Sequence, residues 1–309
     1  MPSPKLKKII AFGLFTAFVL AALSGCRSVT PQPRDLTATA EIPAQTDTPA
    51  ATATVTPTPE PGALMVNGES VPLSEFDAQL KQLQAADAEL AKTRTPEEQR
   101  QMVLDELIDQ TLLAQAAYAA GFVLDDAGLQ QRIDALAADL GGQAALDGWI
   151  TTMGHTSTSF QSALRRAAAS AWQRDTLMDS VSESAEQVNA QQILVRSPDT
   201  AADILRRLNA GAEFATLAAE YDPITKGILG WFPHGYLTQP KVEEAAFGLE
   251  PGAFSAVIET DFGYHIVYVL ERENDRTLSV DARLTLQHKA IENWLVEQRA
   301  AATVEILVP

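Results

Sequence analysis

Apolar residues recur at two different spacings along the chain, and the spacings predict which parts are helices and which are strands. In the first half the spacing is three or four residues, which is typical of helices that bury one face. The clearest stripe consists of Leu104, Leu107, Ile108 and Leu112, and the segment at 95–98 forms a capping box that starts this helix. Further helices are predicted from about residue 74, from about 125 to 140, from about 156 and, near the C-terminus, from about 279.

Short apolar runs bounded by turn residues predict the strands. Asn67-Gly68 is a strong tight-turn signal, and it separates strand-like segments at 63–66 and 69–71. Two longer strand-like segments are V-N-A-Q-Q-I-L-V at 188–195 and F-G-Y-H-I-V-Y-V at 262–269, and T-V-E-I-L-V at 303–308 is a further one. The sequence therefore predicts an α+β protein in which a helical region precedes a region that contains a sheet.

The first 25 residues have the composition of a secretory signal. Three lysines precede an apolar run at 9–23, which is too short for a comfortable membrane span. The sequence L-S-G-C at 23–26 resembles a bacterial lipobox, which implies that the Cys26 thiol is diacylated and that Cys26 becomes the new N-terminus after cleavage of residues 1–25. An uncleaved anchor that contains a cysteine is the alternative. Both interpretations place the rest of the chain outside the cytoplasm.

A segment rich in Thr, Pro and Ala follows at 26–62. Such a composition cannot bury enough apolar surface to offset the entropy lost on ordering, and its prolines favour extended polyproline II conformations. The sequence therefore predicts a disordered tether here. At about 3.1 Å per residue where it is extended, the tether reaches on the order of 100 Å from the bilayer.

Composition narrows the possible chemistry. Cys26 is the only cysteine, which excludes an intrachain disulfide and a cysteine-based metal cluster. The four histidines show no spacing that places two of them on one helix face, so we expect no metal and no other cofactor. The formal net charge is −17, and a surface of this sign repels nucleic acid. The chain also has no phosphate-binding glycine loop and no G-x-S-x-G nucleophile motif.

Three segments lie between the two longer strands: A-E-F-A-T-L-A-A-E-Y-D at 212–222, G-I-L-G-W-F-P-H-G at 227–235 and E-E-A-A-F-G-L-E-P-G at 243–252. In their order and spacing, the strands and these segments resemble the parvulin family of peptidyl-prolyl cis/trans isomerases. The resemblance implies a domain at 186–275 with a four-stranded antiparallel sheet wrapped by helices. It also implies a shallow groove that takes an X-Pro peptide bond.

The helical region carries V-N-G-E at 66–69, S-E-F at 74–76 and V-L-D-E-L-I-D-Q-T-L-L at 103–113. This pattern, with the two further helices, resembles the chaperone region of the PrsA and SurA foldases. The resemblance implies a helical chaperone domain at 63–183, to which a C-terminal helix and strand at 276–309 return. We therefore expect the strand at 303–308 to pair with the strand near 64–66.

The parvulin resemblance also implies a socket for the proline ring. The socket residues are Leu229, Leu237 and Val242, with Phe232 close by. Val242 stands where the family usually has Phe, and Ile228 replaces the usual acid of a G-D-L-G motif. The alternative for each of the apolar socket residues is a place in the hydrophobic core.

The polar residues of the groove depart further from the family. Parvulins usually place one histidine on the first strand and another on the last, flanking a Cys or Asp. His265 matches the last-strand position, Asp222 matches the Cys/Asp position, and Gln192 occupies the first-strand position. The resemblance therefore implies His265, Asp222 and Gln192 as the catalytic set. Two alternatives stay open: His265 as a buried residue that braces the sheet, and Asp222 as the initiator of an Asp-Pro turn.

These features predict a lipid-anchored peptidyl-prolyl isomerase on the extracytoplasmic side of the cell membrane. Its expected partners are unfolded or partly folded exported polypeptides with X-Pro bonds and, through Cys26, the membrane. The alternative is a non-catalytic holdase chaperone whose degenerate parvulin domain only binds peptides, and Gln192, Ile228 and Val242 motivate it. A solute-binding lipoprotein would need two lobes of repeated strand and helix units, and the sequence shows none.

Overall fold

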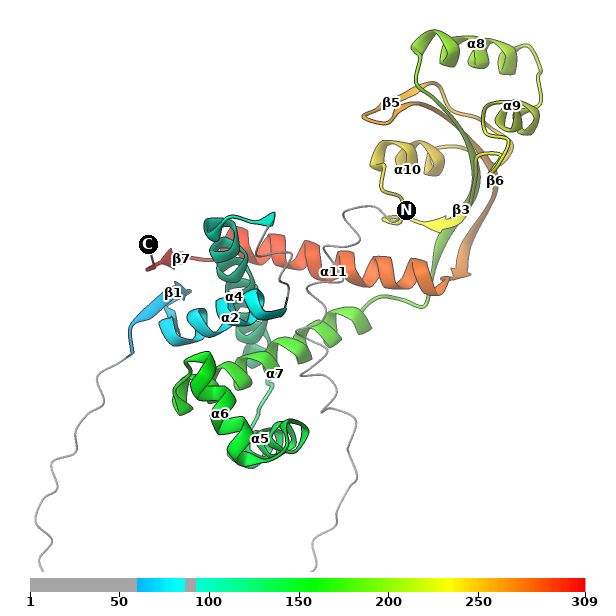
Figure 1. The fold of residues 1–309 in the computed structure, drawn as a ribbon. Coiled ribbons are helices and arrows are strands. Elements are labelled where there is room, and N and C mark those ends of the chain that lie inside the picture. Colours follow the sequence, from blue (N-terminus) through cyan, green and yellow to red (C-terminus); the bar gives the residue numbers. More distant parts are fainter. Residues whose placement is uncertain (1–59, 87–92, 309) are drawn as a thin grey trace, which may run out of the picture. The chain divides into compact units, whose positions relative to one another are not determined.

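The computed structural model describes residues 60–86 and 93–308, and the chain divides into two compact units. The first unit contains the described residues up to Ser170 and those from Ala302, and the second runs from Ala171 to Ala301 (Figure 1). The predicted signal, the lipobox with Cys26 and nearly all of the predicted tether lie outside the described residues. Within the described ranges, no helix is both long enough and apolar enough to cross a bilayer.

A three-stranded antiparallel sheet joins the two ends of the first unit. β1 (Gly62–Val66) lies between β2 (Glu69–Pro72) and β7 (Val304–Ile306). Leu64 is the register partner of Ile306, and the pairing continues to the end of both strands. The predicted pairing of the C-terminal strand with the strand near 64–66 is therefore confirmed.

Asn67 connects this C-terminal strand to the rest of the unit. Asn67 and Gly68 form the turn between β1 and β2, and both have positive φ, 52° and 84°, as a tight hairpin turn requires. The side-chain oxygen of Asn67 accepts a hydrogen bond from the Thr303 N–H at 2.9 Å, across 236 positions of sequence. Its side-chain nitrogen donates to Oε1 of Gln115 at 2.9 Å. One turn residue therefore holds both the strand β7 and the helix that carries Gln115.

Thr95 caps that helix through the predicted capping box, accepting a hydrogen bond from the Glu98 N–H at 3.2 Å. The sequence pattern did not predict one of the helices, because Gly141 and Gly142 end the helix before it and no side chain caps its start at Gln143. In chain order, the helices described in this region are α2 (Leu73–Ala86), α4 (Pro96–Ala119), α5 (Asp126–Leu140), the unpredicted α6 (Gln143–Met153) and α7 (Ser157–Asp179), of which α7 ends in the second unit.

The interior of the first unit contains two large apolar clusters, a small cluster of alanines and a buried ion pair. The first cluster joins the sheet to α2 and α4, and the second joins α5, α6 and the start of α7. Arg166 of α7 forms a buried ion pair with Glu75 of α2. Removal of Arg166 would leave the buried Glu75 carboxyl group without its cationic partner, which is strongly destabilising. The first cluster includes Leu64, Phe76 and Leu107, and the second includes Leu129, Ile133, Phe160 and Leu164.

The second unit is built on a four-stranded antiparallel sheet with the strand order β4-β3-β6-β5. β3 (Ser184–Val195) and β6 (Gly263–Thr277) form the long central pair. β4 (Ile228–Pro233) and β5 (Ile258–Thr260) are the edge strands. The predicted four-stranded antiparallel sheet is confirmed.

Helices cover both faces of this sheet (Figure 1). α8 (Pro198–Asn209) and α9 (Phe214–Tyr221) pack on one face, where Ile193 and Ile266 point. α10 (Pro240–Phe247) packs on the opposite face, and α11 (Val280–Ala301) follows β6. All four predicted socket residues belong to the apolar cluster on the α10 face.

We predict that replacing Asn67 with Gly weakens the three-stranded sheet by about 2 kcal/mol. Glycine tolerates the positive φ of the turn, so the change removes only the two side-chain hydrogen bonds, each worth about 1 kcal/mol. The measurement is the opening free energy of the β1 amides from hydrogen exchange, which reports local opening of this sheet.

The same substitution in a chain that lacks residues 302–309 separates the two bonds. Only the bond to Gln115 remains to be lost in that background, so the effect falls to about 1 kcal/mol. Equal effects in the two backgrounds would show that Asn67 does not hold β7.

Candidate functional site

The register of β3 with β6 places Gln192 beside His265. Leu194 is the register partner of His265, and Gln192 is the partner of Val267. Side chains two positions apart on a strand share a face, so Gln192 and His265 lie diagonally on the same side of the sheet. Oε1 of Gln192 is 2.9 Å from Nδ1 of His265, a hydrogen-bond distance. The structure therefore brings together two of the three residues predicted as catalytic.

His265 is buried, with only 3% of its surface exposed, and both of its ring nitrogens are engaged. Since the Gln192 oxygen can only accept, Nδ1 of His265 carries the proton and donates it. Nε2 then accepts a hydrogen bond from the Thr260 hydroxyl, at 2.9 Å. Burial disfavours the charged imidazolium, and it lowers the pKa of His265 below the ordinary value of 6.5. His265 is therefore a neutral imidazole with a fixed tautomer at neutral pH.

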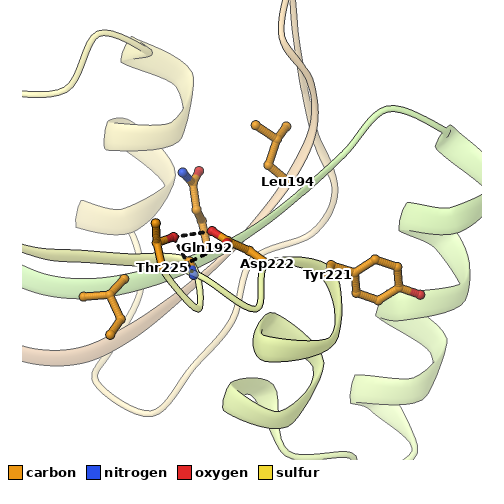
Figure 2. Close-up of a pocket in the computed structure, with 7 residues that line it drawn as sticks. Gln192, Leu194, Tyr221, Asp222 and Thr225 are labelled. Carbon is orange, nitrogen blue, oxygen red and sulfur yellow. Dashed lines mark hydrogen bonds between the residues drawn. The ribbon is translucent and has the colours of Figure 1, made fainter. Parts of the chain in front are cut away.

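A surface pocket opens next to this pair. Figure 2 shows Gln192 and Leu194 on one strand, with Asp222 and Thr225 on the loop that faces them. The side-chain nitrogen of Gln192 donates to no other described residue, so its N–H groups are available to a ligand in the pocket. No cluster of metal-binding side chains was found among the described residues. The pocket is lined by Gln192, Leu194, Tyr221, Asp222, Thr225, Gly227 and Ile228.

Asp222 lines the pocket, but its carboxylate is occupied by its own turn. It accepts hydrogen bonds from the N–H groups of Ile224 at 3.2 Å and Thr225 at 3.0 Å, and from the Thr225 hydroxyl. The hydroxyl and N–H of Thr225 hold the pKa of Asp222 below its usual value. The turn interpretation of the Asp-Pro sequence therefore describes what the side chain does in this structure, and Asp222 makes no hydrogen bond to His265.

Gly227 fixes the backbone between this turn and β4. Its carbonyl accepts a hydrogen bond from the Gln192 N–H at 2.8 Å. Its φ is +65°, and a Cβ at this position would lie 1.8 Å from the Gln192 carbonyl oxygen. Only glycine allows this approach, so the G-I-L-G segment holds the pocket wall against the strand that carries Gln192.

The four predicted socket residues lie together in one apolar cluster on the α10 face. Phe232 and Val242 are almost completely buried, with 0% and 2% of their surfaces exposed. Leu229 and Leu237 are half-buried at the margin of the same cluster. A ligand on this face can therefore contact Leu229 and Leu237, while Phe232 and Val242 support them from below.

Sequence reasoning missed several residues around the site. Thr260 holds His265, and Thr225 holds the Asp222 turn. Thr260 was within reach of prediction, because it is the register partner of Gly263 across a two-residue hairpin turn. Leu194 and Tyr221 carry no local signal, since their place at the pocket depends on how α9 packs against β3.

Comparison with known proteins divides the chain into two matched parts. Residues 178–271 match a family model described as a PPIC-type PPIase domain. Residues 53–161 match a family model described as a SurA-like N-terminal domain. The first match includes Gln192 and Asp222, which line the pocket, and His265, which is hydrogen-bonded to Gln192.

Related proteins match parts of this chain. The foldase protein PrsA of Caldanaerobacter subterraneus subsp. tengcongensis is 48% identical over 94 residues, which are 29% of this chain and 30% of that protein. The foldase protein PrsA of Halalkalibacterium halodurans is 36% identical over 140 residues, which are 44% of this chain and 39% of that protein. This chain therefore covers less than half of the length of each of these two relatives. A crystal structure of the peptidylprolyl isomerase PrsA from Bacillus cereus is 19% identical, covers 75% of this chain and 84% of its own, and has a TM-score of 0.44.

We predict that His265 titrates below pH 6.5 and carries its proton on Nδ1 when neutral. The folded chain then binds fewer protons than the unfolded chain between the lowered pKa and 6.5. The contribution of His265 to the free energy of unfolding is therefore fully present above pH 6.5, and it is lost as the pH drops through that window. Nitrogen-15 NMR of the histidine rings measures both the pKa and the tautomer.

His155 also has a pKa lowered by burial, so it contributes a pH dependence of the same sign. Comparison with the His265→Gln variant isolates the part due to His265, because His155 is unchanged in both proteins. A His265 ring that titrates above 6.5, or a neutral ring protonated on Nε2, would contradict the assignment.

Proposed function

We propose that the chain is a parvulin-type foldase, similar to PrsA and SurA, and that its second unit isomerises X-Pro bonds in unfolded polypeptides. The observation that carries this proposal is the Gln192–His265 hydrogen bond at the wall of an open pocket. The first unit has the SurA-like match, and we assign to it the holding of the same polypeptides while their proline bonds rotate.

Rotation about an X-Pro bond requires no proton transfer and no covalent intermediate. The barrier arises from amide resonance, and the uncatalysed step takes tens to hundreds of seconds. When the amide twists, its carbonyl oxygen loses negative charge and its nitrogen regains a lone pair. A catalyst must bind this twisted amide better than either planar form. Apolar surroundings favour the less polar twisted amide, and a hydrogen-bond donor near the nitrogen stabilises the lone pair.

Gln192 is the group that we place against the peptide. Its oxygen is held by His265, so its side-chain nitrogen is presented in a fixed orientation with two N–H donors. Leu194 and Ile228 add apolar surface to the same pocket. His265 is buried and makes a hydrogen bond at each ring nitrogen, so its proposed role is to position Gln192. Leu229 and Leu237 receive the proline ring in this proposal.

A specific observation supports a second candidate function, that of a holdase. Phe232 and Val242 are buried beneath the surface, so the socket offers a ligand only the half-buried Leu229 and Leu237. Such a surface has little apolar area with which to grip a proline ring tightly. A domain that binds unfolded segments without accelerating their isomerisation fits this geometry as well.

We further propose that the protein acts at the outer face of the membrane on exported polypeptides. The support is the signal-like segment at 1–25, the L-S-G-C sequence that ends in Cys26, and the Thr/Pro/Ala-rich segment at 26–62. A diacylated Cys26 would anchor the chain, since two acyl chains provide stable membrane binding where one gives only marginal binding.

We expect the full chain to accelerate isomerisation of short Ala-X-Pro-Phe peptides, measured by NMR exchange spectroscopy. His265→Ala should lower kcat/KM about tenfold, because the lost hydrogen bond that orients Gln192 is worth about 1 kcal/mol or slightly more. Gln192→Ala should have a similar effect, and the double variant should be no slower than either single one, since the two residues act as a unit.

His288→Ala is the matched control, because His288 is an exposed histidine on α11. It should keep the wild-type rate. No acceleration by a folded wild-type chain that still binds the peptides would refute the isomerase and favour the holdase. Recovery of activity in Gln192→His would then show that glutamine at the first-strand position causes the loss of isomerase activity.

Expression in a bacterial host should attach labelled fatty acid to the chain and place it in the membrane fraction. Cys26→Ser should abolish both, because the diacylated thiol is lost, and Cys26 is the only cysteine available. Fatty-acid labelling of the variant at the wild-type level would disprove lipidation at this residue.

A further inference from the structure

The loop between β4 and α10 carries Leu237, one of the two half-buried residues to which the proline ring is assigned. Its residues, 234–239, lie outside the sheet ladder. Gly235 has a φ of +83°, and the weak 3.4 Å bond from the Tyr236 N–H to the Pro233 carbonyl is the one main-chain bond from the N–H groups of residues 235–237. The backbone alone therefore does little to fix this loop.

The side chain of Glu243 provides hydrogen-bond acceptors for two N–H groups of this loop. Oε1 of Glu243 accepts a hydrogen bond from the Gly235 N–H at 2.6 Å. Oε2 accepts one from the Leu237 N–H at 2.8 Å. One carboxylate therefore bridges two alternate residues of the loop, and both bonds are short, as is typical when the acceptor is charged.

This contact differs from ordinary capping of a helix. Glu243 lies in the first turn of α10, after the N-cap residue Gln239. A capping side chain satisfies N–H groups of the helix itself, whereas both partners of Glu243 precede the helix. Its neighbour Val242 is buried in the apolar cluster of the α10 face, so the helix that carries Glu243 is fixed against the sheet. The carboxylate therefore fixes the loop relative to α10.

We propose that Glu243 is a positioning residue for the proline socket: its carboxylate holds the 234–239 loop so that Leu237 is ready to receive the ring. This inference rests on the proposed function of the site. A loop that is already ordered binds its ligand more tightly, because the entropy of ordering is not lost on binding. Glu243 thus governs the affinity for the proline ring, while Gln192 and His265 govern the rotation step.

The two roles predict different kinetic effects. Gln192 acts on the twisted amide and His265 holds Gln192 in place, so the loss of either residue lowers kcat. The socket holds the ring in both planar isomers and in the twisted amide, so a disordered socket loop raises KM and leaves kcat nearly unchanged. The separation of KM from kcat distinguishes positioning of the socket from general damage to the fold.

The test compares Glu243→Gln with Glu244→Gln in the full chain. Glutamine keeps the size of the side chain but has one acceptor oxygen, so it can accept from only one of the two N–H groups. Glu244 is the adjacent, exposed residue on α10, and its carboxylate has no hydrogen-bond partner among the described residues. The probe is a short Ala-X-Pro-Phe peptide followed by NMR exchange spectroscopy.

We expect Glu243→Gln to raise KM about fivefold, with kcat within twofold of wild type, and Glu244→Gln to change neither. The amide proton signals of Gly235 and Leu237 should move upfield in Glu243→Gln alone, because they lose a charged acceptor. An unchanged KM in Glu243→Gln, an equal effect of Glu244→Gln, or unmoved amide signals would each overturn the proposal. If Glu243→Gln unfolds, Glu243→Asp replaces it, with the same expected direction, since a shorter carboxylate cannot span both N–H groups.

The wild-type chain separates failure of this inference from failure of the proposed function. A wild-type chain that binds and isomerises the peptide while Glu243→Gln matches it would overturn the positioning role alone. A wild-type chain that binds without isomerising would overturn the isomerase, and the role of Glu243 would then be decided by the dissociation constants of the two variants. A folded wild-type chain that binds no proline peptide would overturn both.

Discussion

The long antiparallel pairing of β3 with β6 is the constraint on which the second unit depends. It runs from the partners Ser184 and Thr277 at one end to Val195 and Tyr264 at the other, and it includes two irregularities in register. The diagonal contact between Gln192 and His265 exists only in this register. A slip of one residue would turn every side chain of one strand to the opposite face of the sheet. Each central strand also contributes core residues to both faces, so a slip would disrupt the packing on both, and the core thereby protects the geometry of the site.

The pair of Gln192 with His265 behaves differently from two histidines that share a proton. For a neutral ring the Gln192 oxygen allows one placement of the proton: Nδ1 of His265 donates to Gln192, and Nε2 accepts from Thr260. Burial keeps the imidazole neutral, so this placement persists through the neutral pH range. The donor offered to the pocket is an amide N–H, which does not titrate. Because amide rotation requires no proton transfer, a site with a fixed donor can perform the reaction that the resemblance implies.

Local chemistry made much of the fold predictable, and tertiary packing decided the rest. The Asn67-Gly68 turn and the strands with alternating apolar and polar positions follow from rules that act over a few residues, and the structure contains them. The sequence left two alternatives each for Asp222 and Val242. A carboxylate that caps a turn cannot be told from a catalytic one by sequence, and a valine of the core cannot be told from a valine of the socket. In the structure the carboxylate of Asp222 accepts hydrogen bonds from its own turn, and Val242 is buried in the apolar cluster. The contacts of Glu243 had no signal at all, since its partners are N–H groups of backbone that any residue would provide.

Each unit is closed by a strand pair whose members are distant in sequence, and this has a consequence for folding. Ser184 pairs with Thr277, so the chain enters and leaves this sheet at neighbouring positions. A unit with adjacent ends can stand between two parts of another domain without stretching it. Pairing of β1 with β7 requires closure of the chain between Val66 and Val304, and the entropic cost of closure grows with the length of the flexible loop. Once the second unit has folded, the stretch from Ser184 to Thr277 is no longer flexible, and its two ends are paired with each other. Completion of the second unit therefore lowers the cost of completing the first, so the inserted domain assists the folding of the domain that contains it.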